Sequence, residues 1–274
     1  MKNSRRIRIY KYENWGELRS FIDDLVQKCD FMWRGHSSHE WKLCSSLFRY
    51  FESSKTVSSM REKLERKAIE TFENSIRTSN PNIKLNSSVM SMAYMQHFGC
   101  PTRILDWSRS PYVALYFAIL DAQEYPTIYA LDINGYQNSI ASKLVLDDYD
   151  GELLTDIPNR YYRLLKKESR VNFPIPLIPN PINVREKEQQ SVYLLDMQIE
   201  KATEDMFLPN SNRFVLKIQF SKNPVKQIFR HLTLMNIDGE HLFEGFQGYA
   251  FLAKEQLHGL DSFGESTKMR VAKD

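Results

Sequence analysis

The first stretch with residue types that bind anions is Trp33-Arg34-Gly35-His36, at the end of a predicted short strand over 31–35. An arginine at a strand end places a planar guanidinium at the rim of a sheet, where it can grip two oxygens of a phosphate or carboxylate. The glycine lets the backbone approach a ligand closely. The same residues also suit a purely structural arginine, so this motif leaves both interpretations open.

The second stretch, 96–111, concentrates polar side chains between two apolar helical segments. Its polar members are Gln96, His97, Thr102, Arg103, Asp106, Ser108 and Ser110. Polar groups beside core segments must find hydrogen-bond partners nearby. In one arrangement Arg103 forms an internal ion pair with Asp106 that stabilises the strand. In the other the stretch forms a cleft wall, with an anion at the helix start that Ser110 caps. Both arrangements stay open.

A third polar run, 185–193, leads directly into an apolar strand. Glu188, Gln189 and Gln190 lie where side chains can reach a cleft from the edge of a sheet.

The sequence lacks the motifs of several enzyme classes. The histidines have no metal-ligand spacing, and no G-x-S-x-G elbow or glycine-rich phosphate loop is present, so we expect no metal site. The sequence has three cysteines, an odd number, at wide spacing: Cys29, Cys44 and Cys100. This pattern does not indicate a disulfide framework, so it favours a reducing, cytoplasmic compartment in which each cysteine is a small buried residue.

Composition is ordinary for a globular protein of 274 residues, with 26% charged side chains. The net charge of +3 permits a polyanionic partner without requiring one. Basic clusters at Arg5, Arg6 and Arg8 and over 160–170 fit either a solvated face or a track for phosphates. The longest apolar run, 113–120, is too short to cross a bilayer, so we expect no membrane association.

The order of predicted elements indicates one α+β domain over 1–274, with its core at about 14–255 and a central mixed sheet flanked by helices. Apolar periodicity predicts helices at 14–29, 60–76, 87–98, 112–120 and 224–233, and strands at 31–35, 102–107, 127–133, 191–196 and 213–220. The region 147–181 predicts a basic helix and then a proline-rich segment extended over the surface. Residues 240–248 predict a loop, and the tail after 257 is polar.

Together the motifs resemble the FRG-domain family. The resemblance rests on Trp33-Arg34-Gly35-His36, on Trp41, Leu43 and Arg49, on the run from Gln96 to Ala118, on Arg185, Gln189, Ser191 and Tyr193, and in part on Leu242, Phe243 and Gly248. The sequence departs from the family pattern where His36 replaces glutamine and Ser191 replaces glycine. Gly245 and Gln247 also replace two acidic residues.

The order of these motifs is more loosely similar to that of ADP-ribosyltransferases. That similarity implies a split sheet around a cleft, with NAD as substrate. Arg34 and Arg103 would bind phosphate or ribose, Ser108 and Ser110 would position nicotinamide, and Tyr112 or Tyr116 would stack on it. Glu188, Gln189 or Gln190 would hold the ribose and stabilise its cationic transition state. The further implied NAD contacts are Gly35, His36, Gln96, His97, Thr102 and Asp106.

We therefore expect an NAD-dependent ADP-ribosyltransferase that modifies a macromolecule, with the positive charge favouring RNA or DNA. Such an activity would harm its host, which suggests a bacterial toxin or phage-defence effector controlled by an antitoxin or chaperone partner. Two other interpretations stay open. One is a non-catalytic nucleic-acid-binding module, and the other is a protein-interaction domain that docks through 174–181.

Overall fold

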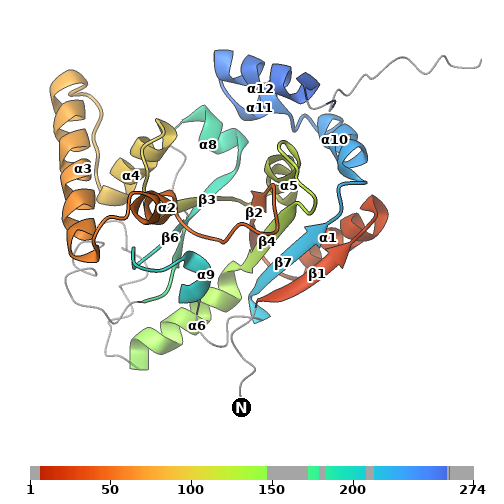
Figure 1. The fold of residues 1–274 in the computed structure, drawn as a ribbon, viewed down its shortest axis with the longest axis horizontal. Coiled ribbons are helices and arrows are strands. Elements are labelled where there is room, and N and C mark those ends of the chain that lie inside the picture. Colours follow the sequence, from red (N-terminus) through yellow and green to blue (C-terminus); the bar gives the residue numbers. More distant parts are fainter. Residues whose placement is uncertain (1–6, 147–171, 179–182, 208–212, 258, 260–274) are drawn as a thin grey trace, which may run out of the picture.

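All strands of the computed structural model belong to one seven-stranded sheet (Figure 1). The structure describes residues 7–146, 172–178, 183–207, 213–257 and 259. The sheet order is β1-β7-β4-β2-β3-β6-β5. The strands are β1 (Arg8–Tyr12), β2 (Phe31–His36), β3 (Ile104–Ser108), β4 (Thr127–Asp132), β5 (Ile175–Leu177), β6 (Ser191–Leu195) and β7 (Val215–Phe220). With its helices, this mixed sheet confirms the predicted α+β class.

Strand pairing is extensive everywhere except at the centre of the sheet. β1 and β7 run parallel, and every other neighbouring pair is antiparallel. β2 pairs with β4 along its whole length, and β3 pairs likewise with β6. Between β2 and β3, however, only Trp33 and Ser108 are paired. The two halves of the sheet are therefore joined by a single residue pair, and β2 and β3 separate beyond it.

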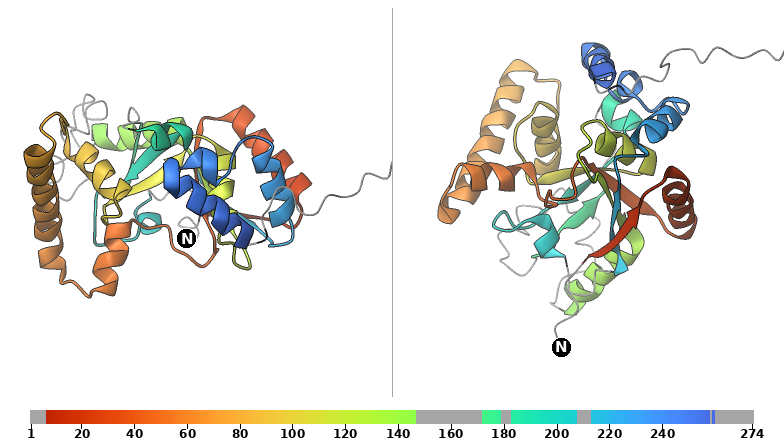
Figure 2. Two further views of the ribbon diagram at one scale, coloured as in Figure 1. Left: turned by 90° about the horizontal axis from the view of Figure 1, so that it is seen from above. Right: turned by 45° about the vertical axis from the view of Figure 1, so that its right-hand side comes forward.

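Three helices cover one face of the sheet (Figure 2). They are α1 (Trp15–Lys28), α5 (Pro111–Ile119) and α10 (Val225–Thr233). Their apolar side chains pack with Trp33 of β2, Ile128 of β4 and Ile218 of β7 in a single buried cluster. α5 is apolar nearly all round and almost completely buried, which is why it lies directly against the sheet.

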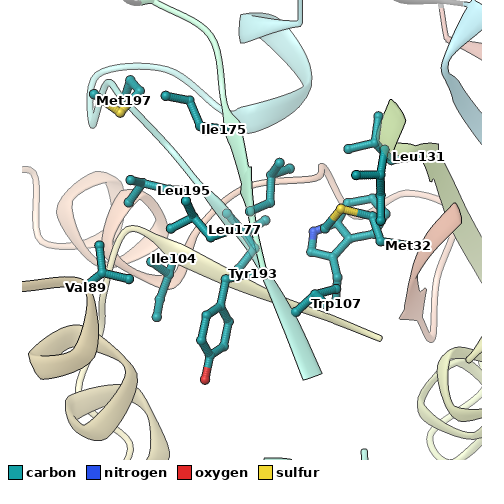
Figure 3. Close-up of a cluster of buried hydrophobic side chains, with 14 of the residues drawn as sticks. Met32, Val89, Ile104, Trp107, Leu131, Ile175, Leu177, Tyr193, Leu195 and Met197 are labelled. Atoms are coloured by element: carbon teal, nitrogen blue, oxygen red, sulfur yellow. The ribbon is translucent and has the colours of Figure 1, made fainter. Parts of the chain in front are cut away.

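The opposite face carries α4 (Ser88–His97), with α3 (Ser58–Ser79) outside it and α6 (Ile133–Leu146) beside β4. Its core holds Met32, Ile104 and Leu195, together with Val89 of α4 (Figure 3). Trp33 belongs to the first cluster and Met32 to the second, as the alternation of a strand requires.

The remaining helices are short or lie at the end of the chain. They are α2 (Ser46–Ser53), α8 (Val184–Glu188), α9 (Thr203–Met206), α11 (Gly239–Leu242) and α12 (Gly245–Leu257). α11 and α12 pack so closely that a Cβ on Gly248 would lie 2.7 Å from the carbonyl oxygen of Phe243. The predicted loop at 240–248 is wrong over most of its length, because α11 and α12 occupy it and Gly248 permits their close packing.

The cap expected at Ser110 is confirmed. Ser110 caps α5, with Pro111 at the first helical position, and Asn14 caps α1. Ser87 caps α4, and Gly99 follows that helix with φ of +85°. The other predicted helices and strands are present, with their ends shifted. The predicted basic helix lies largely outside the described residues. The basic clusters at Arg5 and Arg6 and at 160–170 lie outside them too.

Other predictions need correction. β1, α2 and α6 were not expected, and Arg8 lies in β1. Part of the proline-rich run forms β5, a buried strand at the edge of the sheet, where Pro176 costs no ladder bond on the open side. Of the cysteines, Cys44 is buried as expected, but Cys29 is exposed.

Candidate functional site

A hollow of about 770 Å³ lies where β2 and β3 part. Residues 33–36 of β2 and 106–108 of β3 form its floor, and α5 and α8 contribute walls. Four cationic side chains line it against a single carboxylate, that of Asp106. The cations are Arg34, Lys42, Arg49 and Arg185. The hollow therefore has the volume of a typical small-molecule site and a marked preference for anions.

Arg34 bridges the two parting strands. Its Nη1 donates to the main-chain oxygen of Asp106, and its Nε donates to Nε2 of His36 at 3.2 Å. No carboxylate in the described part of the chain forms an ion pair with it. Burial lowers its pKa, the Asp106 charge raises it and the Arg49 charge lowers it again, yet a guanidinium remains protonated in proteins. The hollow therefore holds a guanidinium whose positive charge no carboxylate pairs with directly.

His36 is neutral in this position. It is only 7% exposed, and burial, followed by the nearby Arg34 charge, lowers its pKa to about 3. Because Nε2 accepts from Arg34, the proton of the neutral ring lies on Nδ1. Nδ1 has no hydrogen-bond partner of good geometry, although the Trp41 backbone is close enough to oppose the pKa shift. His36 thus orients Arg34 without adding charge.

Gly35 lines the hollow and also has a packing role that was not predicted. A Cβ here would lie 2.0 Å from the carbonyl oxygen of Ala114 and 2.7 Å from the nitrogen of Ala118. The missing side chain therefore lets α5 pack closely against β2.

Ser108 and Gln189 line the hollow and are tied to each other. The Ser108 hydroxyl donates to the Gln189 main-chain oxygen at 2.8 Å and accepts from the Ser110 nitrogen at 2.9 Å. The Gln189 side-chain nitrogen donates to the Leu242 oxygen at 2.9 Å. Ser110 itself is occupied as the cap of α5 and does not line the hollow.

Residues 242–251 contact Arg185 of α8 and so hold this side of the hollow in position. The Arg185 guanidinium lies 4.9 Å from the centre of the Phe243 ring, which stacks on Phe251 at 3.8 Å. The Arg185 main-chain nitrogen donates to Glu244 at 2.9 Å. The partial motif match at Leu242 and Phe243 therefore marks a support for Arg185 and Gln189.

Arg103 does not belong to the hollow. It is 1% exposed, and its Nε lies 2.6 Å from Oε1 of Glu65, with a second bond from Nη2 to Oε2. Its Nη1 donates to the main-chain oxygens of Asp196 and Met197. Both the predicted phosphate contact and the predicted pairing with Asp106 are wrong, because the side chain of Arg103 is saturated in the interior.

The two predicted stacking tyrosines also point elsewhere. Tyr116 is fully buried, and its hydroxyl donates to Glu255 at 2.8 Å, which with burial raises its pKa strongly. Tyr112 donates to Asp23 at 3.1 Å. The aromatic side chains that do line the hollow include Trp41, 49% exposed, and Phe117 of α5.

The other predicted residues lie around the site. Gln96 lines a smaller neighbouring hollow, and the buried Thr102 donates to its side-chain oxygen. His97 contacts Phe98 at the end of α4. Glu188 and Gln190 are exposed and do not line the hollow, so Gln189 is the member of that run that does.

Arg49, Arg185, Lys42 and Trp41 line the hollow but were not predicted as site residues. Arg49 donates to the Cys44 oxygen at 2.8 Å from the start of α2. Three of the four belong to the family motifs quoted above, so the motif itself carried the signal that reasoning from residue types missed.

Two absences hold within the described part of the chain. No cluster of three histidine, cysteine or acidic side chains there could hold a metal ion. None of its helices is both long and apolar enough to cross a membrane.

The family model described as FRG domain matches residues 29–126. No curated protein and no solved structure matches the chain. The matched residues include β2, Arg49 and β3, which together build the floor and one wall of the hollow. Residues 29–126 of the chain are therefore an FRG domain.

Proposed function

We propose that the hollow between β2 and β3 binds NAD and that the protein transfers ADP-ribose from it to a nucleic acid. One observation carries this proposal. Arg34 is held between two strands by a carbonyl oxygen and a neutral imidazole, so its charge stays available beside Arg49 and Arg185. Several guanidinium groups around one concave site suit a diphosphate.

The residues present fit the groups of NAD. Arg34, Arg49 and Arg185 offer donors to the two phosphates, and the half-exposed ring of Trp41 offers a face for stacking. The volume of about 770 Å³ is within the range of cofactor sites. The roles first assigned to Tyr112, Tyr116 and Arg103 pass to Trp41 and Arg49.

The chemistry requires a group that favours positive charge on the ribose. The bond between the nicotinamide nitrogen and ribose C1′ breaks, and nicotinamide leaves with the electron pair. The acceptor then bonds to C1′ and gives up its proton. Among the described residues, Asp106 is the one carboxylate that lines the hollow, and the amide residue Gln189 lines it too. We assign charge stabilisation to Asp106 and orientation of the ribose hydroxyls to Gln189.

An activity of this kind damages the cell that contains it. A role as a toxin or phage-defence effector, restrained by a partner protein, is consistent with such chemistry and belongs to the same proposal. A culture test addresses this role. Growth should stop on expression of the chain and continue with Asp106→Asn, and equal growth of both would remove the toxin role alone.

The direct test uses NAD with labelled adenine, single-stranded RNA, single-stranded DNA and cell lysate. We expect free nicotinamide and a labelled nucleic acid, with both lost in Asp106→Asn. Saturating NAD should also raise the melting temperature of the folded protein, since a hundredfold excess over Kd stabilises by about 2.7 kcal/mol. Folded protein that neither releases nicotinamide nor gains stability would rule out the proposal.

A second function is favoured by one observation, the position of Glu188. The carboxylate expected from the third polar run is exposed and outside the hollow. A module that binds phosphate groups of nucleic acid without chemistry needs only the arginines. It predicts salt-dependent binding that is insensitive to NAD and survives Asp106→Asn.

A further inference from the structure

A smaller hollow of about 190 Å³ adjoins the larger one. The two share Arg34, Cys44, Arg49 and Asp106, which therefore form the boundary between them. The smaller hollow has about a quarter of the volume of the larger, too little for a dinucleotide. Its other walls come from the end of α4 and from β3.

Gln96 presents a fixed amide to this smaller hollow. Its side-chain oxygen accepts a hydrogen bond from the hydroxyl of Thr102, which is itself buried. Because the oxygen is occupied in this way, the amide is held in one orientation. The amide nitrogen is left as a donor for a planar polar ligand.

An exposed aromatic residue lies next to the smaller hollow along the chain. Phe98 comes between Gln96 and Gly99 in the sequence, two residues that line this hollow, and it is 72% exposed. The ring of His97 meets the Phe98 ring edge-on at 4.9 Å. The Phe98 and Gly99 nitrogens donate to the Tyr94 and Gln96 oxygens at 3.2 and 2.9 Å, so the helix end fixes the backbone that carries this ring.

We infer that the smaller hollow takes one unpaired base of a single-stranded nucleic acid. The Gln96 amide would donate to the edge of the base, and Phe98 would stack on it or on the next base. Arg49, which lines both hollows, would contact the backbone phosphate. An edge donor and a cation that line one small cavity, together with an exposed ring on the residue that precedes Gly99 of its wall, match the three parts of a nucleotide. This inference rests on the proposed function only in taking nucleic acid as the acceptor, and the binding itself needs no NAD.

Fluorescence anisotropy with labelled oligonucleotides tests the inference on the full chain. The probes are a single-stranded RNA and a single-stranded DNA of mixed sequence, each with its duplex. Phe98→Ala should weaken single-strand binding about tenfold, because stacking contributes about 1–3 kcal/mol per base. Gln96→Glu keeps the size of the side chain and its bond from Thr102 but removes the donor, and it should weaken binding several-fold.

Phe246→Ala is the matched control. Phe246 is 91% exposed and also has an edge-on aromatic neighbour, Tyr249, but neither residue next to it in the chain lines a hollow, whereas Phe98 directly precedes the lining residue Gly99. This control should leave single-strand affinity unchanged. Four outcomes would each overturn the inference. Two concern the variants: equal losses in Phe98→Ala and Phe246→Ala, or no loss in Phe98→Ala. Two concern the wild type: stronger binding of duplex than of single strand, or no binding at all. A loss specific to Phe98 without any thermal shift by NAD would instead support this site and remove the NAD proposal.

Discussion

The two motif arginines, Arg34 and Arg103, occupy opposite kinds of environment. Arg103 is enclosed in the interior and makes two bonds to the carboxylate of Glu65. Arg34 lines a hollow and is held by a main-chain oxygen and the neutral ring of His36. Arg34 lies in β2 and Arg103 directly precedes the adjacent strand β3, and only the charge of Arg103 is paired with a carboxylate.

The comparison shows what separates a structural arginine from one whose charge is available to a ligand. A buried ion pair that is fully hydrogen-bonded has no charge left for a ligand. A guanidinium held by neutral acceptors keeps its charge and leaves some donors unused. The partner of each arginine, more than its own burial, therefore predicts its role.

The largest expected effect is on stability at Arg103. Arg103→Met leaves the Glu65 carboxylate buried without its cation and should lower the free energy of unfolding by about 3–5 kcal/mol. Urea denaturation followed by circular dichroism measures this loss. The double variant Arg103→Met with Glu65→Leu should recover much of the stability. If the single and double variants are equally unstable, the contrast with Arg34 loses its basis.

Arg34→Gln should affect ligand affinity instead of stability. Hydrogen bonds to a charged group contribute about 1.5–3 kcal/mol, so the affinity for NAD should fall at least tenfold. Isothermal titration gives the Kd, and inorganic pyrophosphate serves as a simpler probe of the same arginine. We expect the free energy of unfolding to change by less than about 1 kcal/mol, because no ion pair is broken. A stability loss as large as that of Arg103→Met would contradict the assignment.

The region around Arg103 also contains a carboxyl group that titrates unusually high. Burial raises the pKa of Asp196 to about 7, against hydrogen bonds from Thr203 and Ser45 that lower it. Between its unfolded pKa of about 3.9 and 7, the folded protein binds the extra proton, so this group makes stability fall as pH rises by about 1 kcal/mol per unit. Relative to the wild type, Asp196→Asn should therefore gain stability between pH 4.5 and 6.5. Parallel stability profiles would show that Asp196 is ionised in the fold.

His36, beside Arg34, should act with the opposite sign and a similar size. Its pKa of about 3 in the fold lies below the unfolded value of about 6.5, so between them the unfolded chain binds the extra proton. This contribution raises stability as pH rises and is lost as pH falls below about 6.5. His36→Gln keeps an acceptor for Arg34, and its stability should fall with rising pH relative to the wild type. Urea midpoints at pH 4.5, 5.5 and 6.5 test both variants together.

Local chemistry predicted the element starts well and the long-range packing poorly. Ser110 and Pro111 begin α5 as expected, because a cap and a fixed φ act within one turn. Gly248 suggested a loop over 240–248, since the residue that permits a turn also permits close helix contact. β1 escaped prediction because its half-exposed residues show little apolar alternation.

For the site, sequence motifs predicted which segments meet, but not which side chains face the hollow. Arg34, Asp106, Ser108 and Gln189 do line it, although they are far apart in the chain. Arg103 and Tyr116 face away toward Glu65 and Glu255, which are 38 and 139 residues distant. No local pattern shows such partners, and only the packed fold determines them.

The parting of β2 and β3 after a single residue pair has a consequence for how this site can change. Main chain, not side-chain size, creates the opening, so no one substitution along its walls fills it. Apart from Gly35, which packs against α5, the lining residues can exchange one chemistry for another while the space persists. The histidine that stands at position 36 in place of glutamine is an exchange of this kind.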